Sequence, residues 1–172
     1  NFMDKYLLEA NVRYDGSSKF PSSLQWRAFP SFSAGWRLSE EKFMTWSKPI
    51  LSSLKLRGSW GMIGDQTVSS SLYVPTISQG QVSWLDPSGN KIIYAGTPAA
   101  VDPSITWQDI ATLDFGFDAR FFEGSLGITF DWYQRDTKNM IVPGEGVTWT
   151  FGAGSPKGNF GSLRTRGWGL SL

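Results

Sequence analysis

The chain of 172 residues carries 16 basic and 15 acidic side chains, and its net charge of +1 excludes a broad electrostatic surface for nucleic acid or anionic lipid. It contains no Cys and no His, which excludes thiolate nucleophiles, disulfides, His-dependent triads and the usual zinc sites. Aromatic residues make up 15% of the chain, and 19 Gly and nine Pro interrupt it too often for long helices. The composition therefore predicts an all-β protein.

The first predicted strand covers residues 4–15, where apolar and polar residues alternate. Tyr6 and Tyr14 stand near the two ends of its apolar face, and their spacing corresponds to roughly 20 Å of height for a tilted strand. The strand therefore predicts an apolar band that is closed by an aromatic ring at each end. Its apolar face carries Tyr6, Leu8, Ala10, Val12 and Tyr14, and its polar face carries Glu9, Asn11, Arg13 and Asp15.

Five further segments repeat this alternation, and the connections between them differ in length. The tight reversal at 122–125 predicts the clearest hairpin of the chain. Ser39 is the expected N-cap of one helical turn in the link at 39–50. The further strands are expected near 29–38, 54–62, 105–121, 126–137 and from 159 onward, with connections at 16–28, 39–50, 64–104, 122–125 and 138–159.

Two architectures fit this pattern. A soluble β-sandwich would bury the apolar face of each strand against a second sheet. An antiparallel transmembrane β-barrel would turn that face to lipid, with short turns at one rim and long loops at the other. Strands of about 10 to 14 residues with aromatic ends favour the barrel, but alternation alone leaves the sandwich open.

Five phrases in one order resemble the barrel domain of SusC/RagA-family TonB-linked outer-membrane transporters of Bacteroidetes-type bacteria. They are YLLEANVRYDGSSKF at 6–20, FPSFSAGWRLSEEKFM at 29–44, LKLRGSWGMIGDQ at 54–66, ITWQDIATLDFGFDARFFEGSLGITFDWYQRDTKNMI at 105–141, and NFGSLRTRGWGLSL at 159–172. The resemblance implies a barrel of 22 strands, of which about six lie here. It also implies a location in the bacterial outer membrane.

The same resemblance implies TonB-dependent uptake of glycans or oligopeptides, a SusD-like surface lipoprotein as partner, and no cofactor. We expect the plug domain and the TonB-contacting segment to lie outside these residues, because none of the five phrases belongs to them. The chain opens at Asn1 without a signal peptide and ends within an alternating pattern, so we expect a longer polypeptide at both ends. The loop at 64–104 is the expected contact for the lipoprotein.

Charged residues on the polar faces are the first group of candidate site residues. A pair of carboxylates on the hairpin suggests acid–base catalysis, but the polar inner wall of a large barrel, with opposed charges on neighbouring strands, is the better reading. We therefore expect no enzymatic activity. The predicted lumen-lining charges are Arg13, Arg37, Arg57, Asp114, Asp118, Arg120 and Asp131.

Aromatic residues in the long loops are the second group, because flat rings suit the C–H faces of sugars and anchor ligands well. The alternative is that these rings pack within their own loops. The Gly-rich run at 144–158 lacks the spacing of a phosphate-binding loop and predicts a flexible outer loop. The predicted substrate-binding residues are Trp84, Tyr94, Trp149 and Phe151.

Two rival functions follow from the same residues. A soluble carbohydrate-binding β-sandwich would also be rich in aromatics and would need no detergent. An outer-membrane barrel enzyme would need a nucleophile and a base from elsewhere, since the chain has no His.

Overall fold

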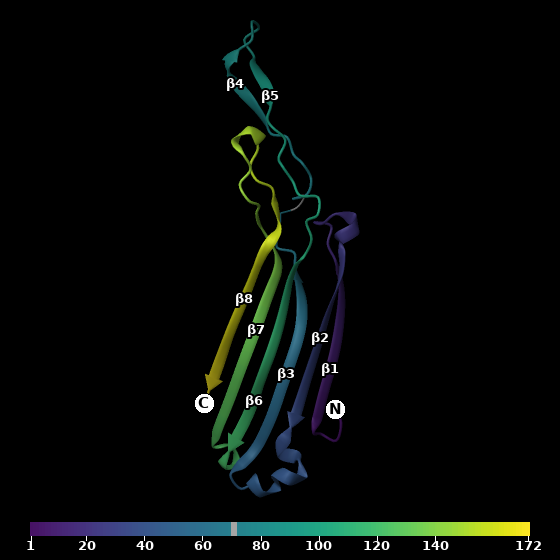
Figure 1. Ribbon diagram of the computed structural model, residues 1–172, viewed down its shortest axis with the longest axis vertical. Coiled ribbons are helices and arrows are strands. Elements are labelled where there is room, and N and C mark those ends of the chain that lie inside the picture. The colour runs from purple at the N-terminus through teal and green to yellow at the C-terminus, as the bar shows by residue number, and fades with distance from the viewer. Residues whose placement is uncertain (70–71) are drawn as a thin grey trace.

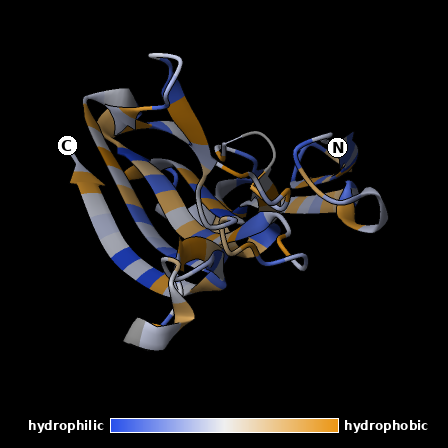
Figure 2. Ribbon diagram, turned by 90° about the horizontal axis from the view of Figure 1, so that it is seen from above, coloured by the Kyte–Doolittle hydropathy of each residue, from blue (hydrophilic) through white to orange (hydrophobic). Residues whose placement is uncertain are grey.

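The alternating segments form six long strands of one antiparallel sheet in a computed structural model that describes residues 1–69 and 72–172, apart from the side chain of Trp149. The strand order is β1-β2-β3-β6-β7-β8 (Figure 1). Seen from above, the sheet is curved and open (Figure 2). The strands are β1 (Tyr6–Gly16), β2 (Trp26–Arg37), β3 (Leu51–Asp65), β6 (Gln108–Phe121), β7 (Leu126–Pro143) and β8 (Lys157–Ser171).

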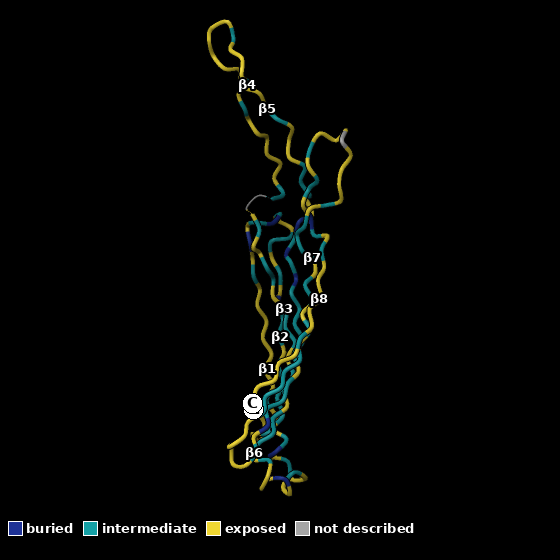
Figure 3. The backbone as a smooth tube through the Cα atoms, turned by 90° about the vertical axis from the view of Figure 1, so that its left-hand side faces the viewer, coloured by how far each residue is buried: buried dark blue, intermediate teal, exposed yellow. Residues whose placement is uncertain are grey.

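The sheet is a single layer, and its apolar face is uncovered. Figure 3 shows the six strands almost edge-on, with no second sheet beside them in the described part of the chain. Phe32 on β2 and Phe115 on β6 are each 52% exposed, although strands flank both of them on either side. A soluble sandwich would bury these side chains. The prediction of a barrel wall is therefore confirmed, and the sandwich is not supported.

Stacked aromatic pairs bind neighbouring strands together on this face. Tyr14 stacks on Trp26 at 5.4 Å between ring centroids near the upper ends of β1 and β2. The sheet contains comparable pairs at Tyr6–Trp36, Phe32–Trp60 and Phe115–Trp132. Aromatic rows of this kind mark the two interfaces of a membrane barrel, so the face between them is the lipid-facing band.

The two rims differ as expected for such a barrel (Figure 1). The lower rim holds two links, one at 38–50 built from η2 (Leu38–Glu40) and η3 (Lys42–Ser47), and one tight turn at η4 (Phe122–Gly124). The upper rim holds connections at 17–25, 66–107 and 144–156, which include η1 (Ser22–Leu24) and η5 (Trp149–Phe151). The connection at 66–107 is by far the longest, whereas the one at 17–25 is shorter than the lower link at 38–50. None of the helices in the described residues is long and apolar enough to cross a membrane.

Four sequence-based expectations need correction. The connection expected at 64–104 contains a separate hairpin of β4 (Gln79–Leu85) and β5 (Lys91–Ala95), because Asp86 and Asn90 close the turn between two short apolar runs. Strand β7 continues to Pro143 through an irregularity above Thr137. Strand β6 begins at Gln108 rather than Ile105. Ser39 lies inside η2, where no side chain caps the helix.

The compact core of the described residues sits at the upper rim. Strands β2 and β3 stop pairing above Ser31 and Gly61, next to Pro30, which has no N–H for a ladder. The rings of Phe20, Phe29 and Trp107, together with Ile105, are buried in this region, and Phe20 and Trp107 lie 5.0 Å apart. The Nε1 of Trp107 donates to the carbonyl oxygens of Leu24 and Gln25, each at 3.2 Å. This core therefore joins the loop before β6 to the loop before β2.

Candidate functional site

In the lower half of the polar face, two rows of register partners place positive charge beside negative charge. The register places Arg37 beside Lys55, and Lys55 beside Asp118. In the next row, Arg57 lies in line with Gly116 and Asp131. In these two rows, basic residues lie on β2 and β3, while acidic residues lie on β6 and β7. Attraction across the β3–β6 ladder follows from this arrangement.

Arg57 is the centre of the ionic contacts on this face. Its Nη2 lies 2.7 Å from Asp131 Oδ1, and its Nε lies 3.4 Å from Asp118 Oδ2. The atoms form ion pairs rather than well-aligned hydrogen bonds, since neither Arg57 Nε nor Asp131 Oδ1 has a hydrogen-bond partner among the described residues. All three side chains are about one-third exposed. Asp118 also accepts a hydrogen bond from the hydroxyl of Thr129 at 3.2 Å.

Gly116 makes this arrangement possible. A Cβ at this position would overlap Asp131 Oδ1 and would lie 2.7 Å from the carbonyl oxygen of Phe130. It would also lie 3.2 Å from Arg57 Nε. Because Gly116 has no side chain, the guanidinium of Arg57 can cross β6 and reach Asp131 on β7.

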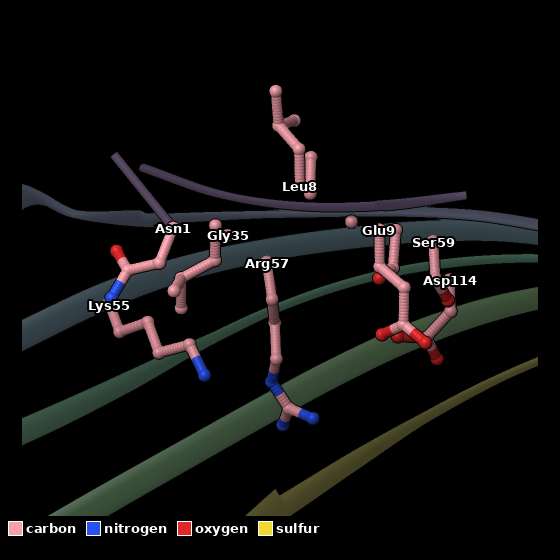
Figure 4. Close-up of a pocket in the computed structure, with 12 residues that line it drawn as sticks. Asn1, Leu8, Glu9, Gly35, Lys55, Arg57, Ser59 and Asp114 are labelled. Atoms are coloured by element: carbon pink, nitrogen blue, oxygen red, sulfur yellow. The ribbon is translucent and has the colours of Figure 1, made fainter. Parts of the chain in front are cut away.

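A shallow hollow of about 500 Å³ opens beside this ion-pair cluster. Lys55, Arg57, Glu9 and Asp114 project into it from three strands, while Leu8 points to the opposite side of the sheet (Figure 4). The hollow mixes two cations with two carboxylates, so it suits polar or zwitterionic groups more than a single ion.

The other predicted lumen charges lie away from this cluster. Arg13 pairs with Asp15 on its own strand at 2.7 Å. Arg37 donates to the carbonyl oxygen of Asp4 at the lower end of β2. Arg120 is exposed near the lower end of β6, opposite Gly127. The structure therefore brings together Arg57, Asp118 and Asp131, with Asp114 nearby, and leaves the three other arginines apart.

Glu41 joins the lower link to the wall. It accepts hydrogen bonds from the hydroxyl of Tyr6 at 2.8 Å and from Trp36 Nε1 at 3.2 Å, and it pairs with Lys5 at 3.2 Å. The hydrogen bond from Tyr6 is the largest cause that lowers the pKa of the Glu41 carboxyl below its usual value, followed by those from Trp36 and Lys5. Two rings of the lower aromatic row are thereby fixed by one carboxylate.

A second polar network closes the upper rim. Asn159 Nδ2 donates to the carbonyl oxygens of Thr106 and Asn139, at 2.9 and 2.6 Å. Asn139 adopts a φ of 57° in the irregular part of β7, a conformation that Asn tolerates better than most residues. Its side chain donates to Asp109 Oδ2, which also accepts from Arg27 at 2.8 Å. Strands β2, β6, β7 and β8 are thus linked where the loops begin.

The structure does not gather the predicted substrate-binding aromatics into one site. Trp84 is 66% exposed on β4, and the ring of Tyr94 on β5 lies over Gly80. Phe151 is exposed on η5, in a different connection. Trp149 lies in the same short helix, but its side chain is outside the described part. Figure 3 shows the hairpin as a mostly exposed projection above the wall.

Alternation in the sequence contained a signal for residues that the site prediction did not name. Alternation assigns Glu9 to the polar face of its strand, and Lys55 and Ser59 to the polar face of theirs. All three residues line the hollow. Gly116 and Glu41 could not be selected in this way, because their roles depend on which strands are neighbours. Among residues 1–69 and 72–172, no cluster of His, Cys, Asp or Glu has the arrangement of a metal site.

Comparison with known proteins agrees with this architecture. The sequence is 30% identical over its whole length to the TonB-dependent receptor P39 of Formosa agariphila and to the TonB-dependent receptor SusC of Bacteroides thetaiotaomicron. It spans about one sixth of these curated relatives, 16% and 17% of their lengths. The RagAB peptide importer in its open-open state superposes with a TM-score of 0.81 at 23% identity, over 99% of this chain and 18% of that one.

The RagAB peptide transporter in a second structure gives a TM-score of 0.77 at 23% identity, covering 96% of this chain and 18% of the other. The family described as TonB dependent receptor-like, beta-barrel matches residues 1–172. These matches confirm the resemblance to SusC/RagA-type receptors and the location in the outer membrane. The chain belongs to the TonB-dependent receptor β-barrel family.

Proposed function

We propose that this chain forms wall strands and outer loops of an outer-membrane importer that takes up glycans or oligopeptides. TonB energises this uptake through a plug domain and a TonB-contacting segment that lie outside these residues. The observation that carries the proposal is the two-faced single-layer sheet, with an uncovered apolar face on one side and the charged cluster around Arg57 on the other. A lipid-facing wall with a polar lumen requires this division.

The ion pairs of the polar face have a supporting role in the proposal. Arg57 forms ion pairs with both Asp118 and Asp131, which favours the ionised form of each carboxylate over a role as a general acid and base. The chain therefore contributes a charged inner wall against which a plug can pack, and no catalytic step.

The proposed partner is a SusD-like surface lipoprotein that contacts the β4–β5 hairpin. Several large apolar side chains are exposed on this hairpin, which rises above the upper rim (Figure 1). Ile93 is 65% exposed and Leu85 is 58% exposed. Exposed apolar side chains gathered on a projecting element are typical of protein contacts.

Growth of a strain that lacks the protein tests the transport proposal. Cells supplied with either an oligopeptide mixture or an oligosaccharide mixture as sole carbon source are expected to lose growth on one of them. The intact gene should restore that growth, and loss of TonB should abolish it again. Equal growth with and without the protein on both mixtures would contradict the proposal.

Co-purification tests the partner separately. Replacing residues 79–95 by a short Gly-Ser linker is expected to release a lipoprotein that co-purifies with the unchanged protein from outer membranes. The matched control is Phe151→Ser in the other long loop, which leaves the hairpin intact. Retention of the lipoprotein after loss of the hairpin would overturn this contact without affecting the transport proposal.

A further inference from the structure

The lipid-facing side of the sheet carries charge only at one end. In the regular ladders of the described strands, alternation places no charged residue on this face in β1, β2 or β3. The charges all lie at the upper ends of β6, β7 and β8. They are Asp109, Asp136, Lys138, Arg164 and Arg166, of which Asp109 is buried in the rim network.

The aromatic row of Trp132 and Trp168 indicates the height of this cluster relative to the membrane. Trp132 and Trp168 are register partners, and the next pair upward on the same face is Gln134 with Arg166, followed by Asp136 with Arg164. Arg166 thus lies about 7 Å along the strand above the ring row. Aromatic rows sit at the membrane–water interface, so these cations stand at the height of the lipid headgroups.

The cluster carries more positive than negative charge. Arg164 pairs with Asp136 through Nε and Oδ1, and a second contact of 3.2 Å joins its Nη2 to Oδ2. Among the described residues, Arg166 donates a side-chain hydrogen bond only from its Nε, to the neutral Oε1 of Gln134 at 2.8 Å. Within the described residues neither Arg166 nor Lys138 has a carboxylate partner, and both are exposed. Apart from the buried Asp109, this cluster therefore has three cations and one carboxylate, Asp136, which is already paired with Arg164, although the whole chain is nearly neutral.

We propose that Arg166 and Lys138, assisted by Arg164, bind the phosphate of an anionic lipid headgroup in the membrane leaflet nearest the long loops. A guanidinium with unpaired N–H donors matches phosphate oxygens in pairs. The stacked rings of Phe115 and Trp132 lie directly below on the same face, where the acyl chains of that lipid would run. This site goes beyond transport, because it concerns the outer surface of the wall.

Native mass spectrometry of the protein purified from outer membranes tests the site, with dioleoyl phosphatidic acid as the probe. The unchanged protein is expected to retain bound lipid, and the double variant Arg166→Gln, Lys138→Gln to bind roughly 25-fold more weakly, because each of the two surface cations contributes roughly a factor of five toward an anionic lipid. The matched control is Arg135→Gln, which removes one charge from the same strand but on the opposite face. Resistance to SDS without heating shows that each variant is folded.

Two further probes identify the bound chemistry. Dioleoylglycerol, which has the same chains without phosphate, is expected to bind weakly to all forms, and inorganic phosphate at equal concentration should not displace the lipid. Equal lipid retention by the double variant and by Arg135→Gln would overturn the site. Displacement by inorganic phosphate would overturn the lipid headgroup as its ligand.

Discussion

Gly116 and Arg57 depend on each other at the scale of single residues. The substitution Gly116→Ala would push a methyl group against Asp131 and the backbone of Phe130, and overpacking of this kind costs about 1–3 kcal/mol. We expect a lower melting temperature of the purified protein in detergent, followed by differential scanning calorimetry. Gly127→Ala is the matched control on the paired strand, because nothing lies within 4 Å of a Cβ there. Equal melting temperatures for the two variants would contradict the role of Gly116.

Glu41 makes the lower rim sensitive to acid. Its lowered pKa means that the carboxylate stabilises the folded state above the ordinary pKa of Glu, about 4.3, and that this contribution is lost as pH falls through the lower folded-state pKa. The variant Glu41→Gln is therefore expected to melt below the unchanged protein at pH 7, and the difference should shrink below pH of about 4. Glu40→Gln, a change at the exposed neighbouring carboxylate, should have little effect at either pH. A difference that stays constant down to pH 3 would sink this explanation.

At the scale of elements, Trp107 ties the long upper loops to the wall. Its buried ring contacts Phe20 and Phe29, and replacing a buried Trp by Ala costs about 3–5 kcal/mol. Trp107→Ala is expected to speed proteolytic cleavage in the connections at 17–25 and 66–107 while the wall strands resist. Trp84→Ala serves as the control, because that side chain is 66% exposed. Unchanged cleavage in Trp107→Ala would show that the loops are held by other contacts.

Strand periodicity predicted the elements of the wall well, and its failures occur where periodicity ends. The apolar face of residues 6–14 follows directly from alternation, and so does the polar position of Arg57. The upper core was missed because Phe20, Phe29 and Trp107 come from three separate segments and meet only where β2 and β3 separate. The cluster at Arg166 was missed for a related reason. Its height relative to the membrane can be inferred only once Trp132 and Trp168 are known to be register partners.

At the scale of the whole molecule, the open sheet leaves two kinds of surface uncovered. Strands β1 and β8 are its edges, and unpaired edges are templates for intermolecular pairing. The apolar face exposes rings such as Trp168 at 70%, in a continuous area far larger than a soluble protein tolerates. Expressed by themselves in water, these 172 residues are expected to aggregate.

Size-exclusion chromatography of residues 1–172 in plain buffer and in detergent tests this expectation. Material in plain buffer should elute in the void volume or sediment, and detergent should disperse it into smaller particles with β-sheet circular dichroism, because micelles cover the apolar face. Changing Trp168 and Leu170 together to Ser should lower aggregation only in part, since the two strand edges remain. A monodisperse, folded species of 19.1 kDa in plain buffer would contradict the expectation, because it would require a cover for the apolar face that the single-layer sheet does not provide.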